Sequence, residues 1–172
     1  PTIGGRNLFL ESGPKDQRSI ETRSDILVFT TQTLTKDVEV TGPLSAILFF
    51  ACDQPDTDVV LRLCDVYPDG RSVLISEGGL RLGVTCYEKG VPCGEQVNKI
   101  RELKIDLWAT SMVFAKGHCI RLSVSSSNYP RYEKNMNIGL LGGHTGKFQK
   151  ARNKVLMGEK NPSRLLLPIV QP

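Results

Sequence analysis

The chain has 172 residues, of which 40% are hydrophobic and 23% are charged, and its formal net charge is +4. This composition indicates a single globular domain that buries roughly 70% of its unfolded surface in one core. Lysine and arginine are interleaved with aspartate and glutamate, and no apolar stretch approaches the roughly 20 residues of a membrane span, so neither a nucleic acid nor a membrane is an expected partner.

The sequence begins at Pro1 without a methionine, which indicates a fragment of a longer protein or a processed product. Its five cysteines are odd in number and show no repeated spacing. This usage favours reduced thiols in a cytoplasmic protein over a disulfide framework. Cys64 and Cys119 fall within strand patterns and are therefore expected to be small core residues.

Residues 1–23 are expected to form an irregular leader, because Gly-Gly and Gly-Pro pairs interrupt them. Leu8, Phe9 and Leu10 form the one run of consecutive strongly apolar residues in this stretch. A leader that exposed them would need either its own sandwich or a partner surface to cover them. The first expected strand follows at residues 26–31.

The next two expected elements form the centre of the fold. Residues 37–51 alternate as a strand that Gly42-Pro43 either divides or bends by a bulge. An apolar strand over residues 59–66, a Pro-Asp-Gly turn and a return strand over residues 71–76 then predict a hairpin. Because the first of these strands is apolar on both faces, the hairpin is expected in the middle of a layered structure and not at its edge.

Period-two alternation marks the second half of the chain. Residues 101–108 and 119–127 each place aliphatic side chains on one face and polar ones on the other, as half-buried antiparallel strands do. A long loop over residues 130–153 separates them from short closing strands at 154–157 and 165–170.

About nine short strands and no convincing amphipathic helix predict an all-β fold, a jelly-roll β-sandwich of galactose-binding-like type over residues 1–172. An immunoglobulin-like sandwich is the alternative. It would need fewer strands and a Cys…Trp…Cys pattern, which Cys52, Trp108 and Cys119 match only in their order.

The catalytic groups of a serine hydrolase are missing from the sequence. No G-x-S-x-G elbow is present, and only His118 and His144 could serve as a base. His118 stands at the start of a strand, where a hydrogen-bonded structural histidine is favoured. His144 lies in a glycine-rich loop and could contact a ligand, but no second metal ligand is spaced near it.

Metal sites are equally weak candidates. Asp53, Asp56 and Asp58 could supply oxygen ligands to calcium, but turns that begin the following strand are the favoured interpretation. Cys86 and Cys93 flank a loop without a CxxC pair or a histidine, so zinc is not expected. No cofactor is predicted.

Several sequence blocks resemble one family over residues 1–170. In chain order they are GGRNLF, GPKDQR, DVEVTGP, PDTDVVLRLCDVYPDGRS, LRLG, WATSMVFAKGHCIRLSVSSSNYPRYEKNMNIG and NPSRLLLP. They resemble the C-terminal jelly-roll domain of cocaine-esterase-like serine hydrolases, a superfamily that includes X-Pro dipeptidyl peptidases, α-amino acid ester hydrolases and glutaryl-cephalosporin acylases. The chain departs from the family pattern at residues 134–139 and 161–163, which are expected in surface loops.

The resemblance implies a non-catalytic domain that follows an α/β-hydrolase domain carrying the Ser, Asp and His. The active site would lie where the two domains meet, with a small ester or X-Pro peptide as substrate. Leu8 and Phe9 match a Leu-Phe pair that lines the acyl pocket in such enzymes. A homodimer stays open. A carbohydrate-binding jelly-roll module is the alternative function, because a fold alone does not assign one, and a free-standing cysteine enzyme is disfavoured because no thiol has a recognisable base.

Overall fold

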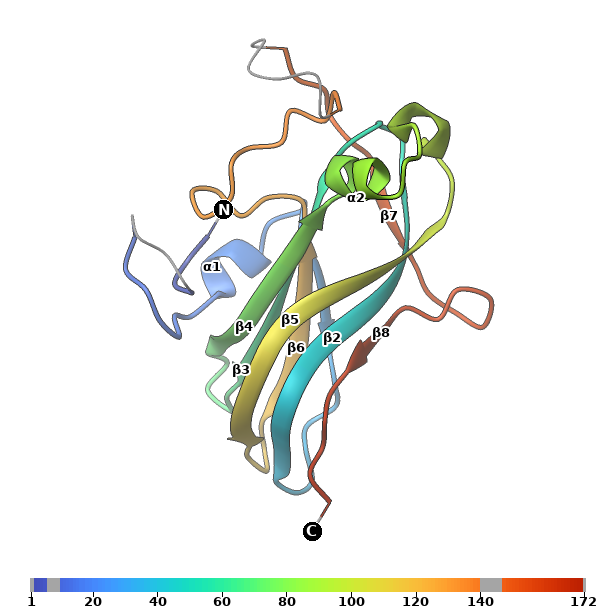
Figure 1. The fold of residues 1–172 in the computed structure, drawn as a ribbon. Coiled ribbons are helices and arrows are strands. Elements are labelled where there is room, and N and C mark those ends of the chain that lie inside the picture. Colours follow the sequence, from blue (N-terminus) through green and yellow to red (C-terminus); the bar gives the residue numbers. More distant parts are fainter. Residues whose placement is uncertain (1, 6–9, 140–146, 172) are drawn as a thin grey trace.

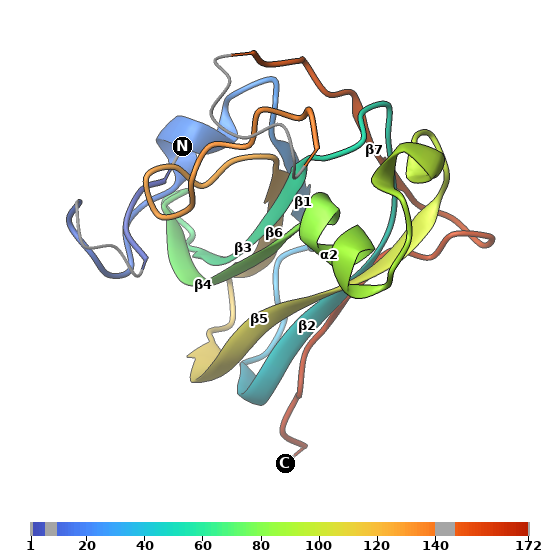
Figure 2. The same cartoon turned by 45° about the horizontal axis from the view of Figure 1, so that its top comes forward.

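The computed structural model describes residues 2–5, 10–139 and 147–171 and shows two antiparallel β-sheets (Figure 1). Figure 2 shows the sheets as separate layers, with β3 and β4 in one and β2 and β5 in the other. The first sheet has the order β1-β6-β3-β4, and its strands are β1 (Leu27–Thr30), β6 (Cys119–Ser125), β3 (Asp58–Val66) and β4 (Ser72–Arg81). The second has the order β5-β2-β7 with β8 also on β2, from β2 (Val38–Cys52), β5 (Arg101–Phe114), β7 (Asn153–Leu156) and β8 (Arg164–Leu166). These sheets confirm the all-β sandwich.

The core lies between the sheets and follows from the alternation of apolar side chains. Leu103, Ile105 and Leu107 of β5 are at most 3% exposed. They face a matching row from the first sheet, since every second residue of a strand points to the same side. The inward residues predicted for β6 are buried as well. The main members of this core are Val40, Leu44, Ala46, Leu48, Phe50, Val59, Leu61, Leu63, Ile120, Leu122 and Val124.

Strand β3 is buried along its whole length, as its apolar character on both faces predicts. Its neighbours in the sheet are β6 and β4, so it is an interior strand. The prediction was wrong for β4, which lies at the end of the strand order. The outer face of the hairpin is covered by irregular segments of the chain instead of a further sheet, and apolar periodicity alone does not distinguish these two kinds of cover.

Two short helices and a 3₁₀ turn were not predicted: α1 (Arg18–Glu21), α2 (Leu82–Glu88) and η1 (Cys93–Gln96). Helix α2 begins where the Leu82 amide donates to the Thr57 carbonyl at 3.0 Å and the Gly83 amide to the Asp56 carboxylate at 2.7 Å. These acceptors satisfy amides at the start of the helix. The helix therefore depends on a tertiary contact that local propensity does not reveal.

Gly42-Pro43 does not break β2, and the bulge at this point has its extra residue in the partner strand β5. The pairing of β2 with β5 shifts between Pro43 and Ser45, and β2 continues on both sides. Opposite this point, β5 runs past Trp108 to Phe114, although the sequence pattern placed Trp108 at the strand end. No helix within the described residues is long and apolar enough to cross a membrane.

Candidate functional site

The leader is attached by its backbone to the edge of β4. The Gln17 amide donates to the Ser72 carbonyl at 2.7 Å, and the Leu74 amide donates to the Lys15 carbonyl at 3.1 Å. Asp16 and Val73 form the bridge between these bonds. Residues 15–17 thereby pair with an edge that would otherwise present free amides and carbonyls.

A second bridge closes the loop that contains residues 6–12. The Gly5 amide donates to the Gly13 carbonyl at 2.9 Å, and the Gly13 amide returns the bond at 3.1 Å. The Gln17 side chain is fully buried, and its amide nitrogen Nε2 donates to the Ile3 carbonyl at 2.8 Å and to the Lys15 carbonyl at 2.9 Å. Both ends of the loop are therefore fixed to the sandwich. The two predicted pocket-lining residues, Leu8 and Phe9, lie in this loop and outside the described residues.

Glycine is required at the entrance of this loop. Gly5 has a φ of +69°, and a β-carbon there would lie 2.1 Å from Oε1 of Glu77. L-residues with a β-carbon are disfavoured at this φ, and the carboxylate leaves no space for one. Gly4 has a different structural reason: its φ is +72°, and a β-carbon there would collide with the Gly13 carbonyl oxygen across the bridge.

Glu77 belongs to a buried charge cluster beneath the leader. Its Oε2 accepts from the Asn128 amide at 2.9 Å, its Oε1 accepts from the Arg131 guanidinium, and Arg62 Nε lies 3.8 Å from Oε2. The Arg62 side chain is fully buried and also donates to the Ser125 hydroxyl at 3.0 Å and to the Asn128 side-chain oxygen at 2.9 Å. Burial lowers the pKa of Arg62, and the Glu77 charge opposes that shift.

This cluster holds the segment that follows β6 against the outer face of β3 and β4. Arg62 comes from β3, Glu77 from β4, and Asn128 and Arg131 from the SSSNYPR block. Every carboxylate oxygen of Glu77 has a hydrogen-bond donor, so Glu77 is a structural anion and not a poised base. The sequence analysis did not predict this cluster. Arg62, a charged residue within the largely apolar strand β3, is the signal that could have indicated it.

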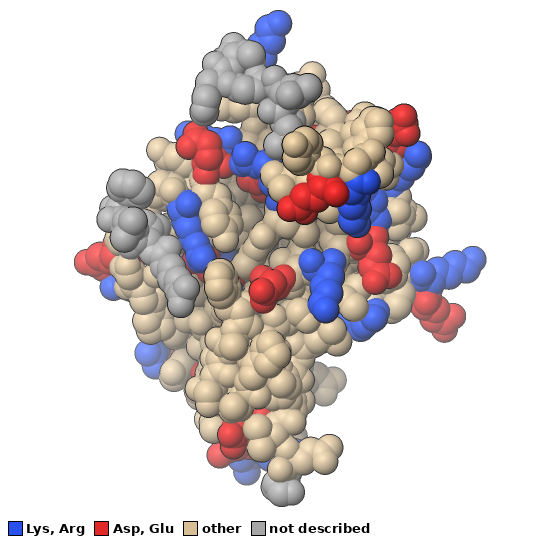
Figure 3. All heavy atoms as spheres, in the orientation of Figure 1, with Lys and Arg blue, Asp and Glu red and all other residues tan. Residues whose placement is uncertain are grey.

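A groove lies beside the leader, between β4 and the second half of β5, with a volume of about 540 Å³. Its walls and floor come from four segments: Gly5, Gly13 and Pro14 of the leader, Leu74–Glu77 of β4, Trp108, Ala109, Thr110 and Met112 of β5, and Arg131 of the segment after β6. Few charged side chains cover the lower half of β5 in the space-filling view (Figure 3). The leader anchor and this groove form the candidate site.

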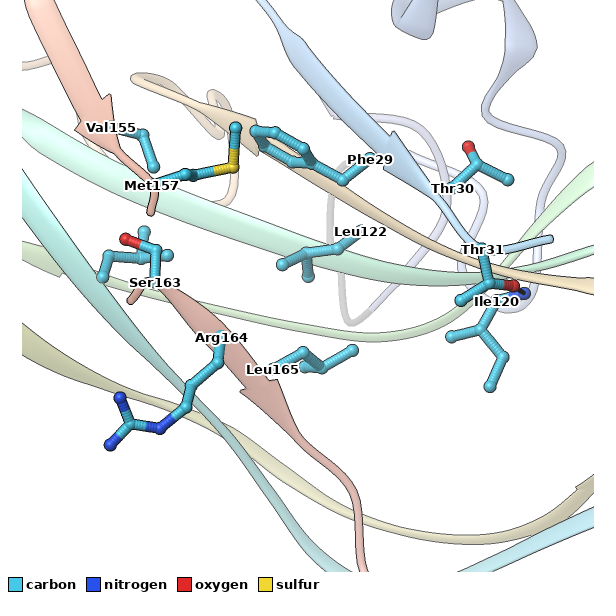
Figure 4. Close-up of a pocket in the computed structure, with 11 residues that line it drawn as sticks. Phe29, Thr30, Thr31, Ile120, Leu122, Val155, Met157, Ser163, Arg164 and Leu165 are labelled. Carbon is cyan, nitrogen blue, oxygen red and sulfur yellow. Dashed lines mark hydrogen bonds between the residues drawn. The ribbon is translucent and has the colours of Figure 1, made fainter. Parts of the chain in front are cut away.

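A second cavity, of about 280 Å³, opens between β1 and β6 on one side and β7 and β8 on the other. Phe29, Leu122 and Met157 surround it, and the Arg164 side chain extends away from them (Figure 4). Its Ser163 hydroxyl already donates to the Leu156 carbonyl at 2.6 Å. This cavity offers apolar surface and no catalytic pair.

The predicted catalytic candidates are not assembled into a hydrolytic site. His118 Nδ1 lies 2.9 Å from Asp65 Oδ1, and its ring packs 4.4 Å from the Tyr67 ring. Within the described part of the chain no serine or cysteine side chain hydrogen-bonds to His118, so the structural interpretation of this histidine is favoured. His144 lies outside the described residues.

The three aspartates around the start of β3 bind different partners. Asp53 accepts from the Arg152 amide at 2.7 Å, Asp56 caps α2, and Asp58 forms a two-bond pair with Arg81 at 2.7 and 3.0 Å. Burial raises the pKa of Asp56. Among the residues with described positions, no group of three His, Cys, Asp or Glu side chains could hold a metal ion.

The five cysteines are unbridged. Cys64 is fully buried in β3, and burial raises the pKa of its thiol to about 12. The prediction was wrong for Cys119, which is only half-buried because it lies at the first position of β6. Cys52 and Cys119 lie in different sheets without a bridge, so the immunoglobulin-like disulfide is not formed.

Comparison with known proteins gives concordant matches. The family model for the X-Pro dipeptidyl-peptidase C-terminal non-catalytic domain matches residues 3–166. The chain is 40% identical over 177 residues to the cocaine esterase of Rhodococcus sp. (strain MB1 Bresler), covering 99% of the chain and 30% of that protein. It is 28% identical over 186 residues to a putative serine esterase of Mycobacterium bovis, covering 99% of the chain and 27% of the relative.

Solved structures show the same fold. An aminopeptidase from a marine sediment Thaumarchaeota archaeon superposes with a TM-score of 0.80 at 26% identity, over 92% of this chain and 28% of that one. An α-amino acid ester hydrolase also gives a TM-score of 0.80, at 24% identity, over 91% of this chain and 27% of that one. The chain therefore spans less than a third of the length of each of these proteins.

Proposed function

The chain belongs to the family of X-Pro dipeptidyl-peptidase C-terminal non-catalytic domains, and from this membership we propose that it stabilises the catalytic α/β-hydrolase domain of a longer serine hydrolase and walls one side of its substrate pocket. The substrate of that enzyme would be a small ester or an X-Pro peptide. Free thiols support a reducing, cytoplasmic compartment. A homodimer of that enzyme is a further expectation.

The observation that carries this proposal is the double anchoring of the leader loop. The Gly5–Gly13 bridge and the buried Gln17 side chain fix both ends of residues 6–12. Anchored flanking residues fix the place where this segment leaves the sandwich and returns to it, which is what presenting it to a neighbouring domain requires. By resemblance, Leu8 and Phe9 are the side chains that would reach the acyl pocket.

The test uses the full-length enzyme. Phe9→Ala and Leu8→Ala should alter the dependence of kcat/KM on acyl size across a series of esters, because a larger pocket tolerates larger groups. The melting temperature should stay close to that of the wild type. The control is Leu27→Ala, an exposed leucine on β1, which should leave both quantities unchanged. Unaltered specificity in both leader variants would contradict the proposal.

A further inference from the structure

Trp108 has an unusual backbone conformation for its place in the fold. It lies inside β5, yet its φ is +65°. A bulky residue with a β-carbon is strongly disfavoured in this region, where glycine is the usual occupant. A hydrogen bond from the Trp108 amide to the Asp106 carboxylate, at 2.7 Å, supports the local geometry.

The cause is a bulge in the pairing of β5 with β2. Asp106 faces Ser45 and Ala109 faces Pro43, so Leu107 and Trp108 together oppose the single residue Leu44. Leu107 is fully buried on the core side, and 54% of Trp108 is exposed. Bulges redirect a side chain at such points. Here the redirected group is the only tryptophan in the sequence.

The exposed indole forms one wall of the groove beside the leader. Leu74 is buried in its floor, and Ile75 and Met112 are half-buried against the core. Among the lining residues that the structure describes, the charged ones are Glu77 and Arg131, which are paired with each other. The groove therefore offers an apolar surface whose charges are already neutralised, and an apolar partner can cover it without leaving these charges unpaired.

The groove is continuous with the leader anchor, because Gly5 and Gly13 line it too. Residues 2–5 lie at this edge, so sequence joined ahead of them would reach the molecule beside the groove. Most of each longer relative lies outside the region that this chain matches.

We propose that Trp108 and this groove dock an apolar segment of the catalytic domain of the same protein, and so position the leader loop at the substrate pocket. This inference rests on the proposed function and names the contact by which the two domains would meet. Buried tryptophans frequently dominate such contacts, because they combine a large apolar area with little conformational freedom. The backbone strain at Trp108 would then be retained for the contact rather than for the sandwich itself.

The experiment measures amide hydrogen exchange and kinetics in the full-length enzyme. Trp108→Ala should raise exchange at the groove strands and at the catalytic-domain surface opposite them by about tenfold or more, the loss that truncating a dominant contact produces. It should also lower kcat/KM. Trp108→Phe should restore part of the protection. The matched control is Val113→Ala, an equally exposed residue of β5 that does not line the groove, and it should behave like the wild type.

Trp108→Gly separates strain from contact. It relieves the positive φ while removing the indole, and the proposal requires the same loss of protection as in Trp108→Ala. If Trp108→Ala behaves like Val113→Ala in both hydrogen exchange and kcat/KM, the docking proposal is overturned. This holds even if Phe9→Ala changes specificity and the proposed function stands. Loss of protection in Trp108→Ala without any effect of Leu8→Ala or Phe9→Ala would support docking and remove the pocket-lining role.

Discussion

Replacing Glu77 by glutamine should destabilise the sandwich much more than replacing an exposed acid. The substitution keeps size and shape but removes the charge that faces Arg62, fully buried, and Arg131, whose side chain is 12% exposed. The new amide group would also point donor hydrogens at the donors of Asn128 or Arg131. Leaving buried cations without their partner costs about 3–5 kcal/mol.

Urea unfolding of the purified chain measures this cost, followed by the fluorescence of its single tryptophan. With a denaturant slope of about 2 kcal/mol per molar, a loss of 3 kcal/mol lowers the midpoint by about 1.5 M. The matched control is Asp69→Asn, which removes an exposed partner of Arg71 and should shift the midpoint little. Equal shifts in the two variants would refute the view that the Glu77 cluster secures the segment after β6.

Two further predictions follow from burial. Iodoacetamide at pH 8 should label Cys119 in the native chain and leave Cys64 unlabelled until denaturant is added, because Cys64 is buried with a thiol pKa of about 12; equal native labelling in a mass spectrum would contradict this. Asp56→Asn should leave the free energy of unfolding at pH 7 unchanged or slightly higher, because burial raises the folded-state pKa of Asp56 and an amide oxygen can still accept from Gly83. Because the folded-state pKa of Asp56 is raised, the wild type is most stable when Asp56 is protonated and loses that stability as the pH rises through the raised pKa. The stability advantage of Asp56→Asn should therefore shrink towards pH 4 in urea titrations. A variant less stable than the wild type at pH 7 would be the contrary result.

The strands that were predicted best are those with strict alternation or continuous apolar character. In the first half of β5, residues 101–107, and in β6 every second residue is aliphatic. A one-residue shift would expose the whole row, so the inward face was unambiguous. Strand β3 was recognised from its apolar faces, but the same pattern could not show that irregular segments cover it. The helix α2 was missed because its first amides depend on Asp56 and Thr57, which precede it by more than twenty residues.

The candidate site was predicted only in part. The Gly-Gly pair and the apolar residues of the leader indicated a segment with a structural or binding role. The reason for Gly5, however, lies in Glu77, which is distant in sequence. The charge cluster joins β3, β4 and the segment after β6, and no local periodicity connects these positions. The sequence pattern ends the strand at Trp108, because the bulge there becomes visible only in the pairing of β5 with Pro43–Ser45 of β2. Family resemblance pointed to Leu8 and Phe9, a prediction that stays open.

The most direct test of the anchored leader is the substrate preference of the full-length enzyme after Gly5→Ala. The added methyl group would collide with the Glu77 carboxylate and force a positive φ on alanine, so the loop entrance must shift. The control is Gly70→Ala, which imposes a comparable φ at the β3–β4 turn and meets no atom within 4 Å. We predict that Gly5→Ala changes the ratio of kcat/KM between a small and a large acyl ester, while Gly70→Ala leaves that ratio at the wild-type value. An unchanged ratio in Gly5→Ala would contradict the role of the leader anchor at the substrate pocket.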